Sequence, residues 1–227
     1  MIQPSPGVML EYEWPRWLPR EVLFPVMRVP LRDASAAGYA EVAKLAPAAA
    51  TELVRAGCAV IAYACTLGSV FAGAQAEEQL LAAIEAASDR PALSLGKTSV
   101  AAFRQLGITR PALLTPYSDV ANGWLCAYLA EHGITPAGVI PTPVDIVTVG
   151  NLSPQEVAAL ALAGLAELPH ADGLWIPCTA IQTIAAISVI EKKGGRSVVS
   201  GSQALLWDAL RAIGQSAPIV GAGRLCT

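Results

Sequence analysis

Hydrophobic and polar residues form two alternating patterns along the chain. Short apolar runs, rich in β-branched residues, are typical of strands buried in a parallel sheet. Longer stretches with apolar residues at helical spacing lie between them. The runs predict strands at residues 21–30, 58–64, 91–95, 111–115, 138–141, 171–177 and 196–200. The periodic stretches predict helices at residues 37–57, 74–88, 97–106, 119–131, 154–167 and 202–213, one beginning at Leu10 and one ending near Lys193.

Local signals mark the ends of several predicted elements. Ser153, with Glu156 three residues later, predicts a capping box at a helix start. Asp119 is expected to cap the helix that follows it. Pro25 predicts that its own run forms an edge strand, because proline cannot donate a hydrogen bond to a neighbouring strand. The residues before Leu10 leave barely room for a strand.

The alternation of strands and helices predicts an α/β fold in which helices cover both faces of parallel sheets. An apolar strand, the pair Cys-Thr and a helical pattern recur in each half of the chain. This repeat predicts two Rossmann-like lobes related by approximate twofold symmetry. Because strand–helix–strand units are right-handed, both lobes would present the carboxyl ends of their strands to a shared cleft, where we expect the active site.

The composition of this 227-residue chain argues against two classes of partner. Hydrophobic residues make up 54% of it, and the uncharged run at residues 56–76 is nominally long enough to span a membrane. Glycine and polar residues interrupt that run, so we expect a buried strand and no membrane segment. The net charge of −3 and the lack of a Lys/Arg-rich block argue against nucleic acid. No secretory signal is visible at the first methionine, which predicts a cytoplasmic protein.

The cysteines and histidines do not form a metal-binding or disulfide pattern. Five cysteines make an odd number without a paired CxxC spacing, so neither a disulfide scaffold nor a zinc site is expected. The two histidines, His132 and His170, lie in predicted surface turns, which gives little support to a histidine-based triad or metal centre. We therefore expect no metal, and a free cysteine becomes a candidate nucleophile.

Two of the cysteines end the buried runs in the two halves. Cys65 and Cys178 would lie at the carboxyl ends of central strands, where open α/β sheets bind ligands. A helix start behind each would lower the thiol pKa. Two opposed thiols can move a proton between the faces of a carbon, and one thiolate can add to an activated double bond. The alternative for any cysteine is that it only packs as a small buried hydrophobic residue. We expect this structural role for Cys58, Cys126 and Cys226.

A carbanion or enolate beside a carboxylate needs hydrogen-bond donors aimed at its oxygens. Thr66-Leu67 and Thr179-Ala180 offer backbone N–H groups at helix starts together with threonine hydroxyls, whereas Leu67 offers its amide alone. Tyr117 follows a predicted strand directly and would bring its hydroxyl to the same rim, although a lone tyrosine there is more often a packing residue. The weaker polar candidates are Ser5, Thr98 and Ser99.

Taken together, these residues resemble the aspartate/glutamate racemase superfamily, within it the branch of maleate cis-trans isomerase and arylmalonate decarboxylase. The matching segments span nearly the whole chain: Tyr63-Ala64-Cys65-Thr66 with Gly68-Ser69, Thr115-Pro116-Tyr117 with Asp119 and Asn122, Pro177-Cys178-Thr179, and Trp207-Asp208 with Leu210-Arg211. The resemblance implies that the last helix returns to the first lobe and that no metal or organic cofactor is used. With the lobe boundary placed from the order of the predicted elements, residues 1–96 plus 202–227 form the first lobe and residues 97–201 the second.

The resemblance also implies roles for single residues. Cys65 matches the first-lobe nucleophile or base of the isomerases and racemases, and Cys178 matches the second-lobe cysteine. Thr66, Tyr117 and the amides after both cysteines match the groups that hold a substrate carboxylate. Arylmalonate decarboxylases have glycine in the place of Cys65, which argues against decarboxylation alone.

The chain departs from the isomerase pattern at two places. The isomerases carry asparagine in an N-terminal Pro-Ser-x-Asn signature, where this chain has Ser5 and then Gly7. A second carboxylate-binding asparagine of theirs falls near Ile146. Both departures weaken recognition of a dicarboxylate and favour a substrate with one carboxylate and a less polar second group.

These observations predict a cofactor-independent isomerase or racemase that acts on a small carboxylic acid through Cys65 and Cys178. The sequence leaves open which thiol starts the reaction and whether the protein forms a homo-oligomer. A decarboxylase resembling arylmalonate decarboxylase is the enzymatic alternative. A small-ligand binding protein of the two-lobed type is the non-enzymatic one, and a catalytically silent Rossmann-like regulator would not need both Cys-Thr motifs.

Overall fold

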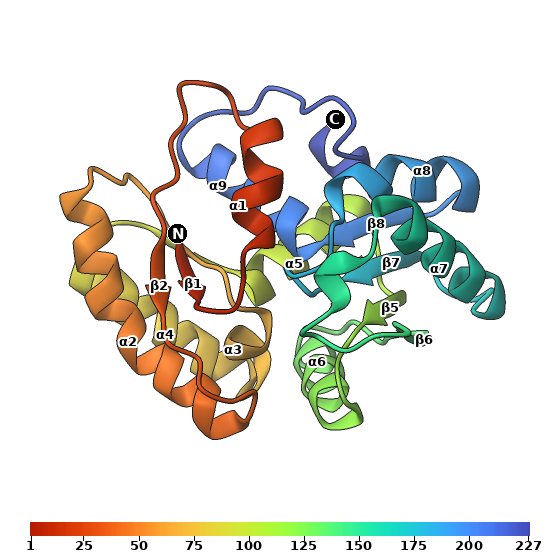
Figure 1. Cartoon of the computed structure of the whole chain (residues 1–227), viewed down its shortest axis with the longest axis horizontal. Coiled ribbons are helices and arrows are strands. Elements are labelled where there is room, and N and C mark those ends of the chain that lie inside the picture. Colours follow the sequence, from red (N-terminus) through yellow and green to blue (C-terminus); the bar gives the residue numbers. More distant parts are fainter.

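Eight short strands form two four-stranded parallel sheets in the computed structural model, which describes residues 1–227 (Figure 1). The first sheet, in the order β2-β1-β3-β4, contains β1 (Ile2–Pro4), β2 (Met27–Val29), β3 (Ile61–Tyr63) and β4 (Ala92–Ser94). The second, in the order β6-β5-β7-β8, contains β5 (Pro111–Thr115), β6 (Gly138–Pro141), β7 (Gly173–Ile176) and β8 (Ser197–Ser200). The same strand order in both sheets confirms the predicted α/β fold of two similar lobes.

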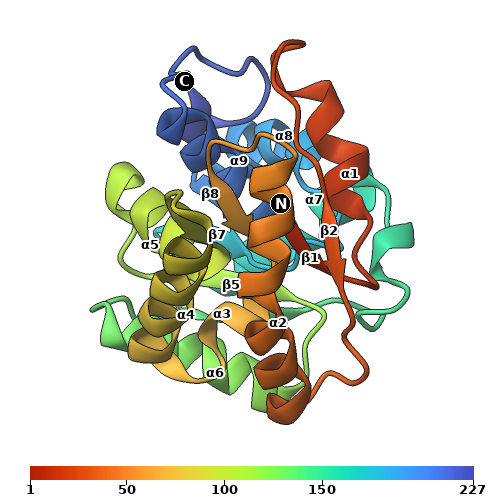
Figure 2. The same cartoon turned by 90° about the vertical axis from the view of Figure 1, so that its left-hand side faces the viewer.

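Helices cover both sheets and also join them. They are α1 (Met9–Glu13), α2 (Ala36–Arg55), α3 (Thr66–Val70), α4 (Gly73–Ser88), α5 (Leu95–Leu106), α6 (Asp119–Glu131), α7 (Pro154–Glu167), α8 (Ile184–Gly194) and α9 (Gly201–Ala212). The helix α2 packs on α4 beside the first sheet, as Figure 2 shows, and α7 packs on α8 beside the second. The helices α5 and α9 pack on each other, and each contacts both β4 and β8.

The strand order places a crevice at the middle of each sheet. From the first strand of each lobe the chain moves outward to the edge strand, β2 or β6, and then returns to the other side as β3 or β7. Connections therefore leave the first and third strands in opposite directions, and open α/β sheets bind ligands at such a switch point. The carboxyl ends of β1, β3, β5 and β7 are consequently the places where site residues are expected.

The two lobes share a hydrophobic core. The larger of the two buried clusters contains most of the first lobe together with Leu113, Trp175 and Val199 from the second sheet. Phe103 of α5 packs edge-on against Trp175 of β7, with ring centroids 5.6 Å apart. Because α5 and α9 each contact both sheets, the assignment of residues 97–201 to the second lobe and 202–227 to the first stays a prediction.

The structure corrects several sequence-based expectations. A first strand, β1, is present although the N-terminal segment leaves it only three residues, and the run at 58–64 forms a strand only over Ile61–Tyr63. A short helix, α3, separates Cys65 from α4. Ser118, not Asp119, caps α6, because the Ser118 hydroxyl accepts the N–H of Ala121 at 3.4 Å.

Other local predictions are confirmed. The Ser153 hydroxyl accepts the N–H of Glu156, and the Glu156 carboxylate accepts the N–H of Ser153 at 2.8 Å, which completes the capping box of α7. The run that contains Pro25 forms its strand only at β2, which lies at the edge of the first sheet. Gly57, expected to close the second helix, follows α2 with a φ of +83°, a conformation that glycine adopts without a steric penalty.

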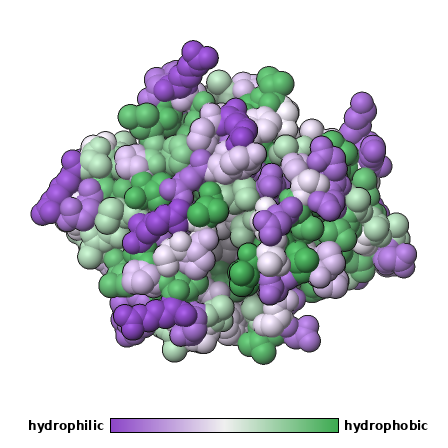
Figure 3. Space-filling view, viewed as in Figure 1, coloured by the Kyte–Doolittle hydropathy of each residue, from purple (hydrophilic) through white to green (hydrophobic).

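The surface mixes hydrophilic and hydrophobic residues, as the face in Figure 3 shows. The most exposed large hydrophobic side chains, Leu23, Val147 and Val220, lie in loops. None of the helices has the length and the apolar character needed to cross a bilayer.

Candidate active site

A cavity of about 380 Å³ lies where the two crevices meet. Residues from the carboxyl ends of β1, β3 and β7, the loop after β5 and the loops after β2 and β6 line it. Its walls are mainly apolar, and the only charged side chains among them are Arg32 and Asp33, both at the exposed rim. The lining includes both predicted thiols, those of Cys65 and Cys178. The structure therefore brings together the two Cys-Thr segments that the sequence placed in separate halves.

Cys65 is buried directly after β3 and is the N-cap residue of α3. Its backbone is extended, so the strand direction continues to the sulfur before the helix begins. The backbone N–H of Gly68 donates to the sulfur, which favours the thiolate. Burial has the larger effect and raises the pKa of the Cys65 thiol to about 12, and the nearby Cys178 sulfur raises it as well.

Cys178 is buried directly after β7, in a turn that ends before α8. Burial raises the pKa of this thiol too. Hydrogen bonds from the Tyr117 hydroxyl and from the backbone N–H groups of Ala180 and Ile181 act in the opposite direction. A thiolate at Cys178 would thus have three donors aimed at it.

The expectation that a helix dipole lowers both thiol pKa values is wrong. The helix after Cys65 has only five residues, and α8 does not begin until Ile184. Helix-dipole effects act within the first turn and are modest, whereas removing a thiolate from water is costly. Both thiols are therefore mainly protonated at neutral pH until a proton acceptor or substrate changes that balance.

Thr66 connects the two halves of the site. Its hydroxyl donates to the carbonyl oxygen of Pro177 at 2.6 Å, and both groups are buried. Because Thr66 follows Cys65 and Pro177 precedes Cys178, this bond fixes one cysteine segment against the other. Thr66 also lies within hydrogen-bonding reach of the Tyr117 hydroxyl.

The structure places all but one of the predicted substrate-binding residues in the cavity wall. Thr66, Leu67, Tyr117, Thr179 and Gly7 line it. The structure gives only the positions of these residues, so their roles in substrate binding stay predictions.

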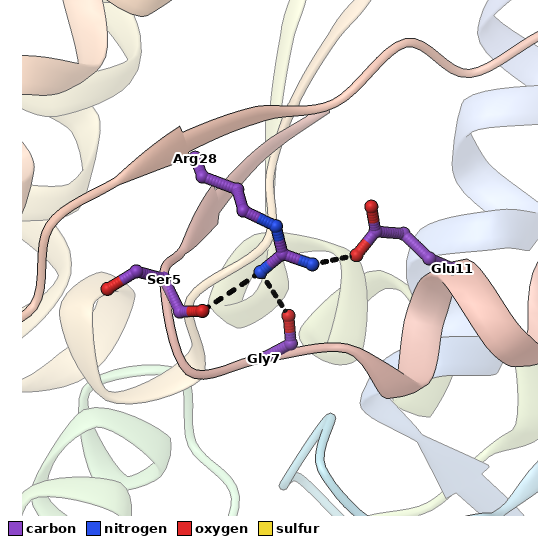
Figure 4. A network of polar contacts seen from close by, with 4 residues as sticks. All are labelled: Ser5, Gly7, Glu11 and Arg28. Atoms are coloured by element: carbon purple, nitrogen blue, oxygen red, sulfur yellow. Dashed lines mark hydrogen bonds and ion pairs between the residues drawn. The ribbon is translucent and has the colours of Figure 1, made fainter.

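Ser5 is the exception and does not line the cavity. Its hydroxyl accepts the N–H of Leu31 at 3.4 Å, and its carbonyl accepts a hydrogen bond from Arg28 (Figure 4). The same guanidinium binds the carbonyl oxygen of Gly7 and the carboxylate of Glu11. Ser5 therefore belongs to the support of the loop that carries Gly7.

Sequence reasoning missed several residues of the wall. Gln3 was overlooked because β1 was not expected, and Leu31 and Ala34 lie in a connection without a recognisable motif. Tyr39 carries no signal either, because its position in α2 is typical of a core residue. Ile146, which the family resemblance singled out, does line the cavity. Thr98 and Ser99, by contrast, are buried in α5 and are not part of the wall.

Nowhere in the chain do three or more histidine, cysteine, aspartate or glutamate side chains gather as they would around a metal ion. All five cysteines are free thiols. Besides the rim side chains of Arg32 and Asp33 and the amide of Gln3, the cavity offers two thiols, tyrosine and threonine hydroxyls, and backbone amides for chemistry.

Two α/β lobes of identical strand order, with a buried thiol from each in one cavity, define a two-lobed enzyme of the racemase type. A family model for arylmalonate decarboxylase matches residues 4–226, so the chain belongs to that family. The resemblance predicted from the sequence is confirmed.

Individual relatives agree with this assignment. Arylmalonate decarboxylase of Bordetella bronchiseptica is 30% identical over 83% of this chain and 79% of its own length. Maleate isomerase of Nocardia farcinica is 27% identical over 99% of this chain and 93% of its own. Among solved structures, a double mutant of arylmalonate decarboxylase in a liganded form superposes with a TM-score of 0.89 at 28% identity, covering 99% of this chain and 96% of its own. The structure of Nocardia farcinica maleate cis-trans isomerase bound to Tris superposes with a TM-score of 0.87 at 26% sequence identity, covering 99% of this chain and 95% of its own.

Proposed function

We propose that the protein is a cofactor-independent isomerase or racemase that acts next to a carboxylate through Cys65 and Cys178. The observation that carries this proposal is the pair of buried thiols, one from each lobe, in one cavity. Its relatives are known as arylmalonate decarboxylase and maleate isomerase. Arylmalonate and maleate both carry carboxylates, which supports a small carboxylic acid as the substrate class.

The substrate carboxylate would lie against the backbone between the two thiols. The first N–H groups of α3, those of Thr66 and Leu67, have no acceptor inside the helix. The Tyr117 hydroxyl and the backbone after Thr179 face the same cavity. Donors of this kind stabilise the extra negative charge that appears on the carboxylate oxygens as an enediolate forms.

In the racemase reaction, one sulfur acts as a thiolate and takes the α-proton from one face of the bound carboxylate. The electron pair of the broken C–H bond moves into the enediolate. The opposite thiol then gives its proton to the other face and becomes the thiolate. The chirality is inverted, and the two sulfurs have exchanged protonation states.

In the isomerase reaction, the thiolate adds to one carbon of an activated C=C bond, and the charge passes to the carboxylate oxygens. The opposite thiol donates a proton to the neighbouring carbon, and the former double bond, now single, rotates. Return of that proton to the opposite sulfur and departure of the first sulfur as a thiolate give the trans alkene. The buried thiols suit both reactions, because a thiolate that is not hydrated is a stronger base and nucleophile than one in water.

The apolar lining supports a substrate with one carboxylate and one less polar group. Leu31, Ala34, Ile146 and Val147 form part of the wall, and the one cation there, Arg32, lies at the exposed rim. A second carboxylate would therefore meet apolar side chains inside the cavity, at a high cost in desolvation.

Decarboxylation is the second candidate function, and the family assignment favours it. Loss of CO₂ from a malonate carrying an apolar substituent gives the same enediolate, and a single thiol suffices to protonate it. The presence of Cys65 distinguishes this chain from that one-thiol arrangement. We further propose a cytoplasmic location, because five free thiols without a disulfide are typical of a reducing compartment.

Proton NMR in deuterated water tests the proposal directly. Wild type, Cys65→Ala and Cys178→Ala would each receive maleate, aspartate, glutamate, an arylmalonate and an enantiopure 2-arylpropionate. We expect inversion or α-deuteration, or conversion of maleate, in the wild type and its loss in both variants. Decarboxylation that survives Cys65→Ala would establish the second candidate instead. Substrate binding without any turnover, together with unreactive thiols, would contradict both and favour a binding protein.

A further inference from the structure

Tyr63 carries a buried hydroxyl that makes no hydrogen bond in the folded protein. The side chain belongs to β3 and has no exposed surface. Its Oη atom is also buried and makes no hydrogen bond. A buried hydroxyl without a partner costs free energy, so phenylalanine would be the better residue for packing alone.

The Cys65 sulfur lies beside this hydroxyl. Tyr63 and Cys65 are two residues apart in extended backbone, so their side chains point to the same face. The surroundings of Gly68 place the Tyr63 hydroxyl near the Cys65 sulfur. A Cβ atom at residue 68 would lie 2.5 Å from Oη of Tyr63 and 2.8 Å from Sγ of Cys65. The hydroxyl and the sulfur therefore border the same small space, which the absence of a side chain at residue 68 leaves open.

We propose that Tyr63 is a positioning residue whose hydroxyl donates a hydrogen bond to the Cys65 thiolate and stabilises it during turnover. This inference rests on the proposed function, in which Cys65 passes through a thiolate. A hydrogen bond to a charged acceptor is stronger than one between neutral groups, so the hydroxyl would favour the anion over the thiol.

Each of the two thiols would then have one tyrosine hydroxyl as a hydrogen-bond donor. Tyr117 lies within hydrogen-bonding reach of Cys178 in the second lobe, and Tyr63 would donate to the Cys65 thiolate in the first. A racemase that works in both directions must form a thiolate at either sulfur, and a donor at each site serves that need. Tyr63 also opposes the effect of burial on the pKa of Cys65, in the same direction as the N–H of Gly68.

The other titratable groups facing Cys65 are few. Tyr39 from α2 and Cys178 from the loop after β7 are close enough to interact electrostatically with it. Tyr117 approaches from the loop after β5, and Arg32 and Asp33 lie at the cavity rim. None of these places a positive charge beside the sulfur, which leaves Tyr63 as the side-chain donor on its own strand.

The reactivity of the Cys65 thiol can be measured without any enzymatic turnover. In a Cys178→Ser background, the rate of iodoacetamide alkylation of Cys65 at pH 8 would be followed by mass spectrometry of its peptide, with and without Tyr63→Phe. We expect the rate to fall about threefold to tenfold. A rise of one pKa unit lowers the thiolate fraction about tenfold, and the greater nucleophilicity of the more basic thiolate recovers part of that loss.

Tyr117→Phe is the matched control, because it removes a tyrosine hydroxyl from the same cavity but from the other thiol. It should leave alkylation of Cys65 within about twofold and slow alkylation of Cys178 when the background is Cys65→Ser. Gly68→Ala is the second variant, since a methyl group there would separate Oη from the sulfur. It should reproduce the effect of Tyr63→Phe, while circular dichroism verifies that each variant is folded.

An unchanged alkylation rate and pH profile in folded Tyr63→Phe would overturn the inference, because a hydroxyl with a purely structural role would not alter the thiol. The result also separates this inference from the proposed function. A slower Cys65 in a protein that turns over none of the carboxylates would support the Tyr63–Cys65 pair and reject the substrates.

Discussion

The proposed catalytic role of the two thiols predicts how activity depends on pH. Burial raises the pKa of Cys65 to about 12, and it raises that of Cys178 in the same direction. Either reaction begins with a thiolate, so the active fraction of the enzyme grows as protons are removed. We expect kcat/KM to rise about tenfold per pH unit from pH 6 to beyond the ordinary cysteine value of about 8.5. A plateau reached below pH 8 would show that substrate or protein lowers the thiol pKa far more than the free cavity does.

The same raised thiol pKa values should make the folded protein less stable as pH rises, whereas activity should increase. A thiol whose pKa is higher in the folded protein binds its proton more tightly there than in the unfolded chain. Its contribution to stability is complete below the unfolded pKa and is lost as pH rises toward the folded value. Urea unfolding at pH 8 and pH 10 should therefore show a smaller decrease in stability for a Cys65→Ala, Cys178→Ala double variant than for the wild type. An equal decrease would mean that other groups dominate the alkaline loss.

At the scale of the elements, a surface network holds the loop that carries Gly7 (Figure 4). Arg28 of β2 donates to the carbonyl oxygens of Ser5 and Gly7 and pairs with Glu11 of α1. Both charged side chains are about one-third exposed, so the pair itself contributes little to global stability. Its effect should be local, on the wall of the cavity.

We expect Arg28→Met to raise KM several-fold with a smaller change in kcat, because the loop loses two carbonyl contacts while the thiols remain in place. Steady-state kinetics and thermal unfolding would be measured together. Arg55→Met, which removes an exposed partner of Glu52 on α2, is the control and should leave KM unchanged. A Tm lowered by many degrees in Arg28→Met would indicate instead that the network supports the whole lobe.

A second connection between elements joins α1 to the start of α8. The buried carboxylate of Glu13 accepts the N–H groups of Thr183 and Ile184 at 2.7 and 2.9 Å. The first N–H groups of a helix need such acceptors. Burial raises the pKa of Glu13, despite these hydrogen bonds, so the stability linked to it falls as pH rises from the ordinary carboxyl range through the raised value.

We expect Glu13→Ala to lower the free energy of unfolding by about 1–3 kcal/mol, since two buried donors lose their acceptor. Glu13→Gln keeps an acceptor oxygen without the charge and should retain most of the stability, with a weaker dependence on pH between 5 and 7. Urea titrations at both pH values would measure this, with the exposed Glu41→Ala as control. Equal losses in the alanine and glutamine variants would contradict a capping role.

At the scale of the whole molecule, the two lobes are fixed against each other around the site. Gly201, the first residue of α9, lies against the backbone that precedes Cys178. A Cβ atom there would approach the carbonyl oxygen of Pro177 to 2.6 Å and a methyl group of Leu95 to 3.3 Å. The same Pro177 carbonyl accepts the Thr66 hydroxyl from the first lobe. The start of α9 therefore lies against the backbone segment that carries the second thiol and that Thr66 links to the first.

We expect Gly201→Ala to cost about 1–3 kcal/mol of stability, as overpacking in a core commonly does, and to lower kcat more than tenfold by displacing Pro177. Gly123→Ala is the matched control, because a methyl group added at this position of α6 would have no atom within 4 Å. That substitution should be neutral or stabilise the protein by up to about 1 kcal/mol. Unchanged activity in Gly201→Ala would show that the Pro177 backbone moves without consequence.

Much of the fold follows from short-range patterns. The alternation of apolar runs and helical periods depends on neighbouring residues alone, and it located β3 to β8 and most helices within a few residues. The pair Cys65 and Cys178 could be found for the same reason, since a buried strand followed by a reactive side chain is a local signal. Strand β1 escaped because its three residues include Gln3 and Pro4, which are unusual in a central strand.

The sequence by itself determined the alternating α/β architecture and the Cys-Thr pair that follows a buried strand in each half, because each depends on residues close together in the chain. Only the tertiary structure decided that Thr66 bonds to Pro177, that Ser5 supports a loop and does not line the cavity, and that Tyr63 lies beside the Cys65 sulfur. It also reversed the expected direction of the thiol pKa shifts. Burial and contacts between distant segments set these properties, and neither can be read from local spacing.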